Sequence, residues 1–125
     1  MHTTSLAEFT DIFPTLCEAV GIPIPDTVEG CSQLPVLLGS AGKVRDYALS
    51  QYPRMGTMGY SLRTDRWRYT EWRTPEGEIK SRELYDLENN PAERRNVALE
   101  NPAAEAGQAA LLKRVLTSLG ERRPK

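Results

Sequence analysis

Apolar and polar residues alternate in short runs over the central part of the chain, and this alternation restricts the fold more than any other feature. The runs are "DYALSQY", "TMGYSLR", "RWRYTEW" and "RELYDL". Thr64-Asp65 and the later segment "TPEGE" separate runs and have compositions typical of tight turns. A period of two residues is that of a half-buried β-strand. We therefore predict an antiparallel meander of about four strands.

The alternation also predicts the two faces of this sheet. Met58, Tyr60 and Leu62 share one face of their run, and Trp67, Tyr69 and Glu71 share one face of the next. The opposite face of the second run carries Arg66, Arg68, Thr70 and Trp72. We expect Tyr60, Leu62, Trp67 and Tyr69 to pack against the C-terminal helix or against a neighbouring domain.

Helix signals flank the predicted sheet on both sides. Asp11 is placed to cap a short helix over "DIFPTLCEAVG", with Pro14 in its first turn and Gly21 after its end. Asn90-Pro91 with Glu93 predicts a helix start with a capping box. Asn101-Pro102 repeats the cap-plus-proline signal, and we expect a helix from Pro102 to Leu119 that Gly120 ends. Strands followed by a covering helix indicate the α+β class.

The N-terminal helix has an apolar stripe that is wide for its length: Ile12, Phe13, Leu16, Cys17 and Val20. So short a helix is stable only when such a stripe is packed against a partner. A proline- and glycine-rich segment follows over residues 22–43, with at most one helical turn near Ser32–Leu38. Long irregular connections are unusual in compact domains, so we expect this segment to run over a larger body.

Composition excludes several function classes. The formal net charge is −1, which gives no general attraction to nucleic acid or to anionic membranes, and no apolar run is long enough to span a bilayer. Two cysteines and one histidine do not make a disulfide framework or a zinc site. We expect Cys17 to be a buried thiol, Cys31 to lie in a loop and His2 to be solvated. No Gly-rich phosphate loop and no nucleophile motif occurs.

Aromatic and arginine residues are interleaved between Ser50 and Arg73. Such a pattern can stack on nucleic-acid bases, but it is also that of an ordinary half-buried hairpin, which the slightly acidic charge favours. Within it, Pro53, Gly56 and Gly59 predict an interruption of the strand. We therefore expect Tyr52 and Arg54 to lie at the mouth of a loop.

Four stretches carry a family resemblance: "DIFPTLCEAVGIPIP", "EGCSQLPVLLG", "SQYPR" with "MGYSLRTDRWRYTEW", and "ELYDLENNPAERRNVA". In this order they resemble the C-terminal part of type I sulfatases of the alkaline phosphatase superfamily, most closely the iduronate-2-sulfatase-like branch. The likeness runs from about Leu6 to Val97. Asn90 replaces the usual aspartate, and either residue can cap a helix.

The resemblance implies how this region is organised. Residues 1–40 would be the terminal helix and crossing loop of a large α/β sulfatase domain. Residues 41–125 would be the small C-terminal domain, in which a four-stranded antiparallel sheet packs with a helix. The chain would then begin after the last catalytic residue, and the catalytic domain would be its partner.

The resemblance also implies a chemistry that this region does not carry. Sulfatases hydrolyse sulfate esters with a formylglycine made from cysteine in Cys-x-Pro/Ala-x-Arg, and calcium polarises the sulfate. Neither Cys17 nor Cys31 lies in that motif. We therefore assign no catalytic residue and no metal ligand to this chain, and place calcium in the full-length enzyme. Family members are often periplasmic, secreted or lysosomal.

In the iduronate-like branch the small domain borders the active-site cleft. The resemblance thus makes Tyr52 and Arg54 candidate substrate-binding residues, with Arg54 contacting a carboxylate or sulfate. The alternative for Arg54 is a salt bridge across a domain interface. Two other functions stay open: a non-catalytic interaction module, and a phosphate or phosphonate ester hydrolase of the same superfamily. A second copy of the chain, joined through the N-terminal helix, is a further candidate partner.

Overall fold

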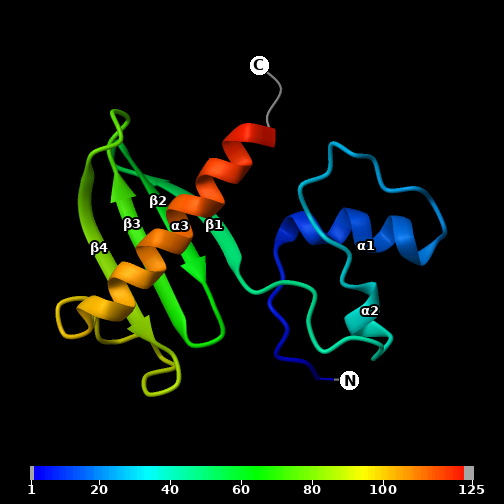
Figure 1. Ribbon diagram of the computed structural model, residues 1–125, viewed down its shortest axis with the longest axis horizontal. Helices are drawn as coiled ribbons and strands as arrows, with labels where there is room; N and C mark the ends of the chain where they lie inside the picture. The colour runs from blue at the N-terminus through cyan, green and yellow to red at the C-terminus, as the bar shows by residue number, and fades with distance from the viewer. Residues whose placement is uncertain (1, 123–125) are drawn as a thin grey trace. The chain divides into compact units, whose positions relative to one another are not determined.

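The computed structural model describes residues 2–122 of the 125-residue chain (Figure 1). The chain divides into two compact units, Met1–Leu49 and Ser50–Lys125, which are described separately. The expected boundary near residue 40 stays a prediction. No helix among the described residues is both long and apolar enough to cross a membrane.

The second unit is built on a four-stranded antiparallel sheet of sequential order, as the alternation predicts. Its strands are β1 (Ala48–Arg54), β2 (Thr57–Arg63), β3 (Trp67–Arg73) and β4 (Ile79–Asp86). Met55 and Gly56 both have positive φ, 46° and 76°, and form the two-residue hairpin turn between β1 and β2. The predicted turns at Thr64-Asp65 and over residues 74–78 join the other strands.

The core of this unit lies between the sheet and α3 (Pro102–Arg122), which crosses one face of the sheet (Figure 1). Leu62, Tyr69 and Leu84 are aligned across β2, β3 and β4, and all three are fully buried. Leu112 and Val115 of α3 are buried as well. The predicted packing of Leu62 and Tyr69 beneath the helix is therefore confirmed. Tyr60 and Trp67 are half-buried.

The segment between β4 and α3 corrects one prediction. No helix starts at Asn90; residues 87–101 form turns, and Glu93 has a φ of +52° that no α-helix accepts. The segment instead pairs with the edge of β4, where the Val97 amide donates to the Leu84 carbonyl at 2.8 Å. The helix start after Asn101 is confirmed, but α3 continues through Gly120 to Arg122, because glycine lowers helix stability without forbidding the helix.

The first unit contains η1 (Phe9–Asp11), α1 (Ile12–Ala19) and α2 (Leu34–Leu37), which is the single turn expected near residues 32–38. Gly21 has a φ of +73°, and the amides of Gly21 and Ile22 donate to the carbonyls of Glu18 and Cys17. This is the Schellman ending that glycine permits. The expectation that Asp11 caps α1 is wrong: its backbone is helical, and its side chain makes no cap bond to that helix. It instead completes the capping box of η1, where it accepts from the Glu8 amide.

The side chain of Asp11 points instead into the first unit, where it is 1 % exposed. Its carboxylate accepts hydrogen bonds from the amides of Glu8 and Cys31 and from the Gln33 side chain, each at 2.9 Å. Arg45 pairs with it as well. Burial alone would raise the pKa of Asp11, but these donors and the Arg45 charge lower it. Asp11 thus ties together three segments: residues 8–11, residues 31–33 and the segment that carries Arg45.

The apolar stripe of α1 is only partly covered in the first unit. Cys17 is buried, as expected, and is a free thiol. The other members, together with Phe9, are more than half exposed: Phe9, Ile12, Phe13, Leu16 and Val20. The first unit therefore presents a contiguous apolar helix face, which we call the α1 face.

Candidate functional site: the distal face of the sheet

The sheet face opposite α3, which we call the distal face, carries polar and aromatic residues from all four strands. It forms a hollow of about 350 Å³. Its lining follows the period of two along each strand and adds one residue from the loop after β4: Ser50, Tyr52, Gly59, Ser61, Arg68, Thr70, Trp72, Glu83, Tyr85 and Glu93. All of them belong to the second unit, so the hollow is a property of that unit alone.

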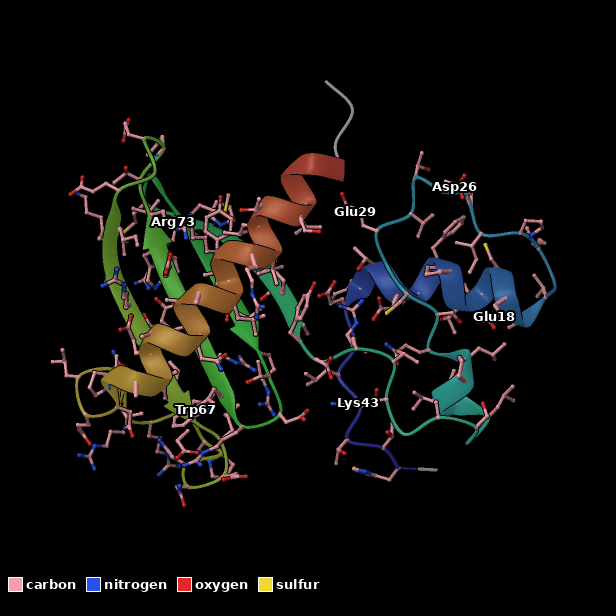
Figure 2. The ribbon with its side chains drawn as sticks, in the orientation of Figure 1. Glu18, Asp26, Glu29, Lys43, Trp67 and Arg73 are labelled. Atoms are coloured by element: carbon pink, nitrogen blue, oxygen red, sulfur yellow. The ribbon has the colours of Figure 1, made fainter. Side chains whose placement is uncertain are left out.

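Trp72 is the central side chain of this face. Figure 2 labels the two ends of β3, Trp67 and Arg73, and Trp72 lies beside the Arg73 end. Trp72 is directly opposite Gly59 on β2, and its ring occupies the space above that glycine. A Cβ at Gly59 would lie only 2.9 Å from the ring, so the glycine is required by the close approach of the indole.

Glu83 fixes the other side of the indole. The Trp72 Nε1–H donates to one oxygen of Glu83 at 2.9 Å, and the Tyr85 hydroxyl donates to the other at 3.0 Å. Burial and the hydrogen bond to Glu83 raise the pKa of Tyr85, which keeps its phenol protonated as a donor. Ser61 and Thr70 form a hydroxyl pair beside these groups at 3.0 Å. The aromatic rings are therefore held in place before any ligand arrives.

The arginines of the distal face differ in their partners. Arg68 forms an ion pair with Glu93 at 3.3 Å. Glu93 is the residue with the φ of +52° in the loop after β4. Arg63 donates to the carbonyls of Thr64 and Asp65. Arg54 lies over the Trp72 ring, 5.8 Å from its centroid. Within residues 2–122 the Arg54 side chain has no hydrogen bond and no ion pair.

Both predicted site residues lie on the distal face, two positions apart on β1. Tyr52 lines the hollow and is 65 % exposed. Arg54 ends β1 directly before the turn that contains Gly56. The expected strand breaks at Pro53 and Gly59 are wrong, because β1 runs through Pro53 to Arg54 and β2 runs through Gly59, so Tyr52 lies within a regular strand. An edge strand tolerates proline, and the Trp72 ring fills the space beside Gly59. Whether Tyr52 and Arg54 bind substrate stays a prediction.

Trp72 and Glu83 are the residues that sequence reasoning missed. The alternation places Trp72 on the face opposite Tyr69, which is correct. The missing step was the register: counting back from the Thr64-Asp65 turn puts Trp72 opposite Gly59 and hence beside the β1–β2 hairpin. No sequence signal indicates the contact of Trp72 with Glu83, which lies on the next strand.

The two cysteines and His2 are not among the residues that line the hollow of the distal face. Cys31 lies in a loop, as expected, and burial raises the pKa of its thiol, so the protonated form predominates. His2 is exposed. Among residues 2–122, no three His, Cys, Asp or Glu side chains gather in an arrangement that could hold a metal ion. This region therefore does not fit a calcium site.

Comparisons with known proteins agree with the fold. Residues 1–121 match the family described as "N-sulphoglucosamine sulphohydrolase, C-terminal". The chain is 37 % identical over 93 residues to a Δ4,5-hexuronate-2-O-sulfatase of Bacteroides thetaiotaomicron, covering 70 % of this chain and 18 % of that protein. It is 29 % identical to human arylsulfatase K over 111 residues, 82 % of this chain and 20 % of that protein.

Solved structures give the same result. A candidate sulfatase of B. thetaiotaomicron superposes with a TM-score of 0.74 and 33 % identity, over 86 % of this chain and 24 % of that one. The candidate sulfatase YidJ of Bacteroides fragilis gives 0.82 and 26 %, over 92 % and 26 %. The chain thus spans about a fifth of the length of its curated relatives. Sulfatases are generally metal-dependent enzymes, and this chain belongs to their family as a sulfatase C-terminal region.

Proposed function

We propose that this chain is the C-terminal part of a sulfatase that removes sulfate from a uronic-acid-containing sugar, such as an iduronate 2-sulfate. The similarity to the Δ4,5-hexuronate-2-O-sulfatase is the observation that supports the substrate class. The catalytic domain is the partner, and it carries the formylglycine and the calcium ligands. Calcium supplies polarisation of the sulfate there.

While the catalytic domain carries out the reaction, the residues of the present chain bind and orient the sugar. Arg54 is exposed, lacks an ion-pair partner in the described chain and can make a two-pronged contact with a carboxylate or sulfate. Tyr52 lies two residues away on the same face and offers a ring and a hydroxyl. Residues 1–40 complete the large domain, and residues 41–125 form the small one.

The α1 face is where this chain would meet the catalytic domain. Burial of each large apolar side chain contributes roughly 1.5–3 kcal/mol. Exposed apolar patches of this kind are typical of interaction sites. The size of the matched sulfatases, about five times that of the chain, supplies a body large enough to cover the face.

A chimera tests the proposal. This chain replaces the matching C-terminal region of the B. thetaiotaomicron Δ4,5-hexuronate-2-O-sulfatase, and sulfate release from a Δ4,5-hexuronate 2-O-sulfate disaccharide is measured. We expect turnover by the chimera and none by the chain alone. A well-folded, calcium-loaded chimera that releases no sulfate from this sugar, yet hydrolyses a phosphate monoester, would contradict the proposed ester.

The same chimera tests Arg54. A hydrogen bond to a charged group contributes about 1.5–3 kcal/mol, so Arg54→Ala should raise KM for the sugar sulfate about 10- to 100-fold. KM for a small neutral aryl sulfate should barely change. Arg95→Ala, which removes an exposed arginine paired with Glu100, is the matched control. An equal loss on both substrates with a lower melting temperature would place Arg54 in a domain interface instead.

A further inference from the structure

We propose that the hollow of the distal face is a saccharide subsite, in which the Trp72 ring faces the sugar and Arg54 binds its acidic group. The chemical class of the sugar rests on the proposed function. The subsite itself rests on the arrangement of the side chains, and three features of that arrangement support it.

The first feature is rigidity. Trp72 is confined by Gly59 beneath it and by the Glu83 carboxylate at its Nε1–H. Tyr85 holds Glu83 from the far side. A ring fixed from two sides loses little conformational entropy when a ligand covers it, so a modest contact yields net binding.

The second feature is the balance of charge. The negative charge of Glu93 is paired with Arg68, and both oxygens of Glu83 accept hydrogen bonds from aromatic donors. Arg54 remains, with an aromatic face as its only described contact. Of the arginines of the hollow and its rim, Arg54 is thus the one whose side chain has neither a hydrogen bond nor an ion pair within residues 2–122, although the Arg68 Nε–H also lacks a hydrogen-bond partner. A sugar whose acidic end faces Arg54 complements this pattern, whereas a ligand with acidic groups along its whole length would meet the carboxylates of Glu83 and Glu93.

The third feature is the supply of neutral hydrogen-bonding groups. The hydroxyls of Ser50, Tyr52, Ser61 and Thr70 line the same hollow as the rings of Trp72 and Tyr85. Apolar ring faces next to a few polar groups are typical of small-molecule sites. A volume of about 350 Å³ lies within the usual range for such sites. A sugar ring presents an apolar C–H face and a rim of hydroxyls, which matches both sets of groups.

The test uses the chain itself and its two tryptophans as reporters. The indole N–H signals of Trp72 and Trp67 are followed by NMR during titration with three disaccharides: a Δ4,5-hexuronate 2-O-sulfate disaccharide, the same disaccharide without the sulfate, and a neutral disaccharide. Trp67 is the internal control, because it shares the α3 face of β3 with Tyr69. We expect the Trp72 signal to shift with the sulfated sugar while the Trp67 signal stays in place.

The three sugars identify the acidic group that Arg54 binds. A shift with both acidic sugars assigns the uronate carboxylate, and a shift with the sulfated one alone assigns the sulfate. Arg54→Ala should weaken the binding at least tenfold, while Arg95→Ala leaves it unchanged. Trp72→Phe keeps a ring but removes both the donor to Glu83 and the indole signal, so its binding is followed by the backbone amide signals of the strands that line the hollow. It should be weaker too, with the amide spectrum of the free protein otherwise preserved.

Other results would overturn the subsite. These are no Trp72 shift with any sugar at a concentration of tens of millimolar, equal shifts with the neutral and acidic sugars, or equal movement of Trp67. The outcome is separable from the proposed function. An active chimera with no Trp72 shift would reject the subsite alone, and binding by the chain with an inactive chimera would leave the subsite in place.

Discussion

The side chain of Asn96 forms hydrogen bonds to the free edge of β4 that a neighbouring strand would otherwise form. Its side-chain oxygen accepts the Leu84 amide at 2.9 Å, and its side-chain nitrogen donates to the Arg82 carbonyl at 3.1 Å. One amide side chain thus satisfies a donor and an acceptor that an edge strand leaves open. This explains why an asparagine, and not merely a polar residue, stands at that position.

The first prediction concerns this edge. Asn96→Ala removes both bonds to β4 and also the bond that the Asn96 side-chain oxygen accepts from the Ala98 amide at 3.1 Å. It should lower the free energy of unfolding by about 1–2 kcal/mol, since the site is exposed and water replaces part of the loss. Asn96→Asp keeps the acceptor for Leu84, so its free energy of unfolding should fall between those of the wild type and Asn96→Ala. Urea unfolding of the three proteins measures the order of their stabilities. Equal stability of all three proteins would show that the two bonds contribute nothing.

Asp86 gives the second prediction, on pH. Hydrogen bonds from Arg66 hold the pKa of Asp86 well below its usual range, and Asn89 and the Glu88 amide add to this. A lowered native pKa stabilises the fold fully above the unfolded pKa of about 4, and this stability is lost as the pH falls below it. Asp86→Asn should therefore melt at a lower temperature than the wild type at pH 7.

The difference between the two melting temperatures should then shrink as the pH falls below about 4, because the unfolded wild-type chain takes up a proton at Asp86 while the folded protein does not. Asp11 also has a lowered pKa, so both proteins lose stability in acid for a second reason. The difference between the melting temperatures of the wild type and Asp86→Asn is therefore the quantity that reports on Asp86. Asp46→Asn is the control, since that carboxylate is largely exposed and pairs only with Lys43. A gap that stays constant from pH 7 to pH 2 would contradict this account of Asp86.

At the scale of elements, the strands follow from the sequence and the irregular segments do not. Alternation gives β2 and β3 and the face on which Leu62 and Tyr69 lie, because only one face of this sheet can be buried under one helix. The helix predicted to start at Asn90 does not form. Its cap-and-proline signal is local, whereas the Val97 and Asn96 bonds to β4 are tertiary and override it.

The candidate site divides in the same way. Tyr52 and Arg54 could be named from a resemblance, but the continuation of the predicted strand through Pro53 to Arg54 could not, because the edge position that tolerates Pro53 is set by the sheet order. The hollow depends on contacts between strands, such as that of Trp72 with Glu83, which a single sequence does not reveal.

The docking of α3 on the sheet gives the third prediction. Leu112 is fully buried, and the Tyr69 hydroxyl lies 3.2 Å from the Glu105 carboxylate of the same helix. Leu112→Ala should lower the free energy of unfolding by about 2–5 kcal/mol, because it leaves a cavity between helix and sheet. Leu99→Ala removes the same atoms from a residue that is 98 % exposed and should change it by less than about 0.5 kcal/mol. Similar losses for both variants in denaturant unfolding would mean that α3 is not docked through Leu112.

At the scale of the whole molecule, the two units differ in how fully they satisfy their own side chains. The second unit buries an apolar core between the sheet and α3. The first unit is organised by the polar cluster around Asp11, while its largest apolar residues stay exposed on the α1 face. A unit held mainly by one buried carboxylate and its partners, with its apolar stripe uncovered, is suited to completing a larger body.

The last prediction follows from that imbalance: the chain by itself should self-associate through the α1 face. Phe13 and Leu16 lie one turn apart on α1 and are both more than half exposed, so Phe13→Ser with Leu16→Ser should make the chain monomeric in sedimentation equilibrium. Met55→Ser with Leu99→Ser also removes two exposed apolar residues, but from separate places in the second unit, and should leave association unchanged.

Removing residues 1–40 deletes the α1 face, spares β1 and should increase solubility. Fusion to the catalytic domain in the chimera should abolish association as well, because that domain would occupy the same face. A wild-type chain that sediments as a monomer while the amides of α1 are protected from hydrogen exchange would show that the α1 face needs no partner.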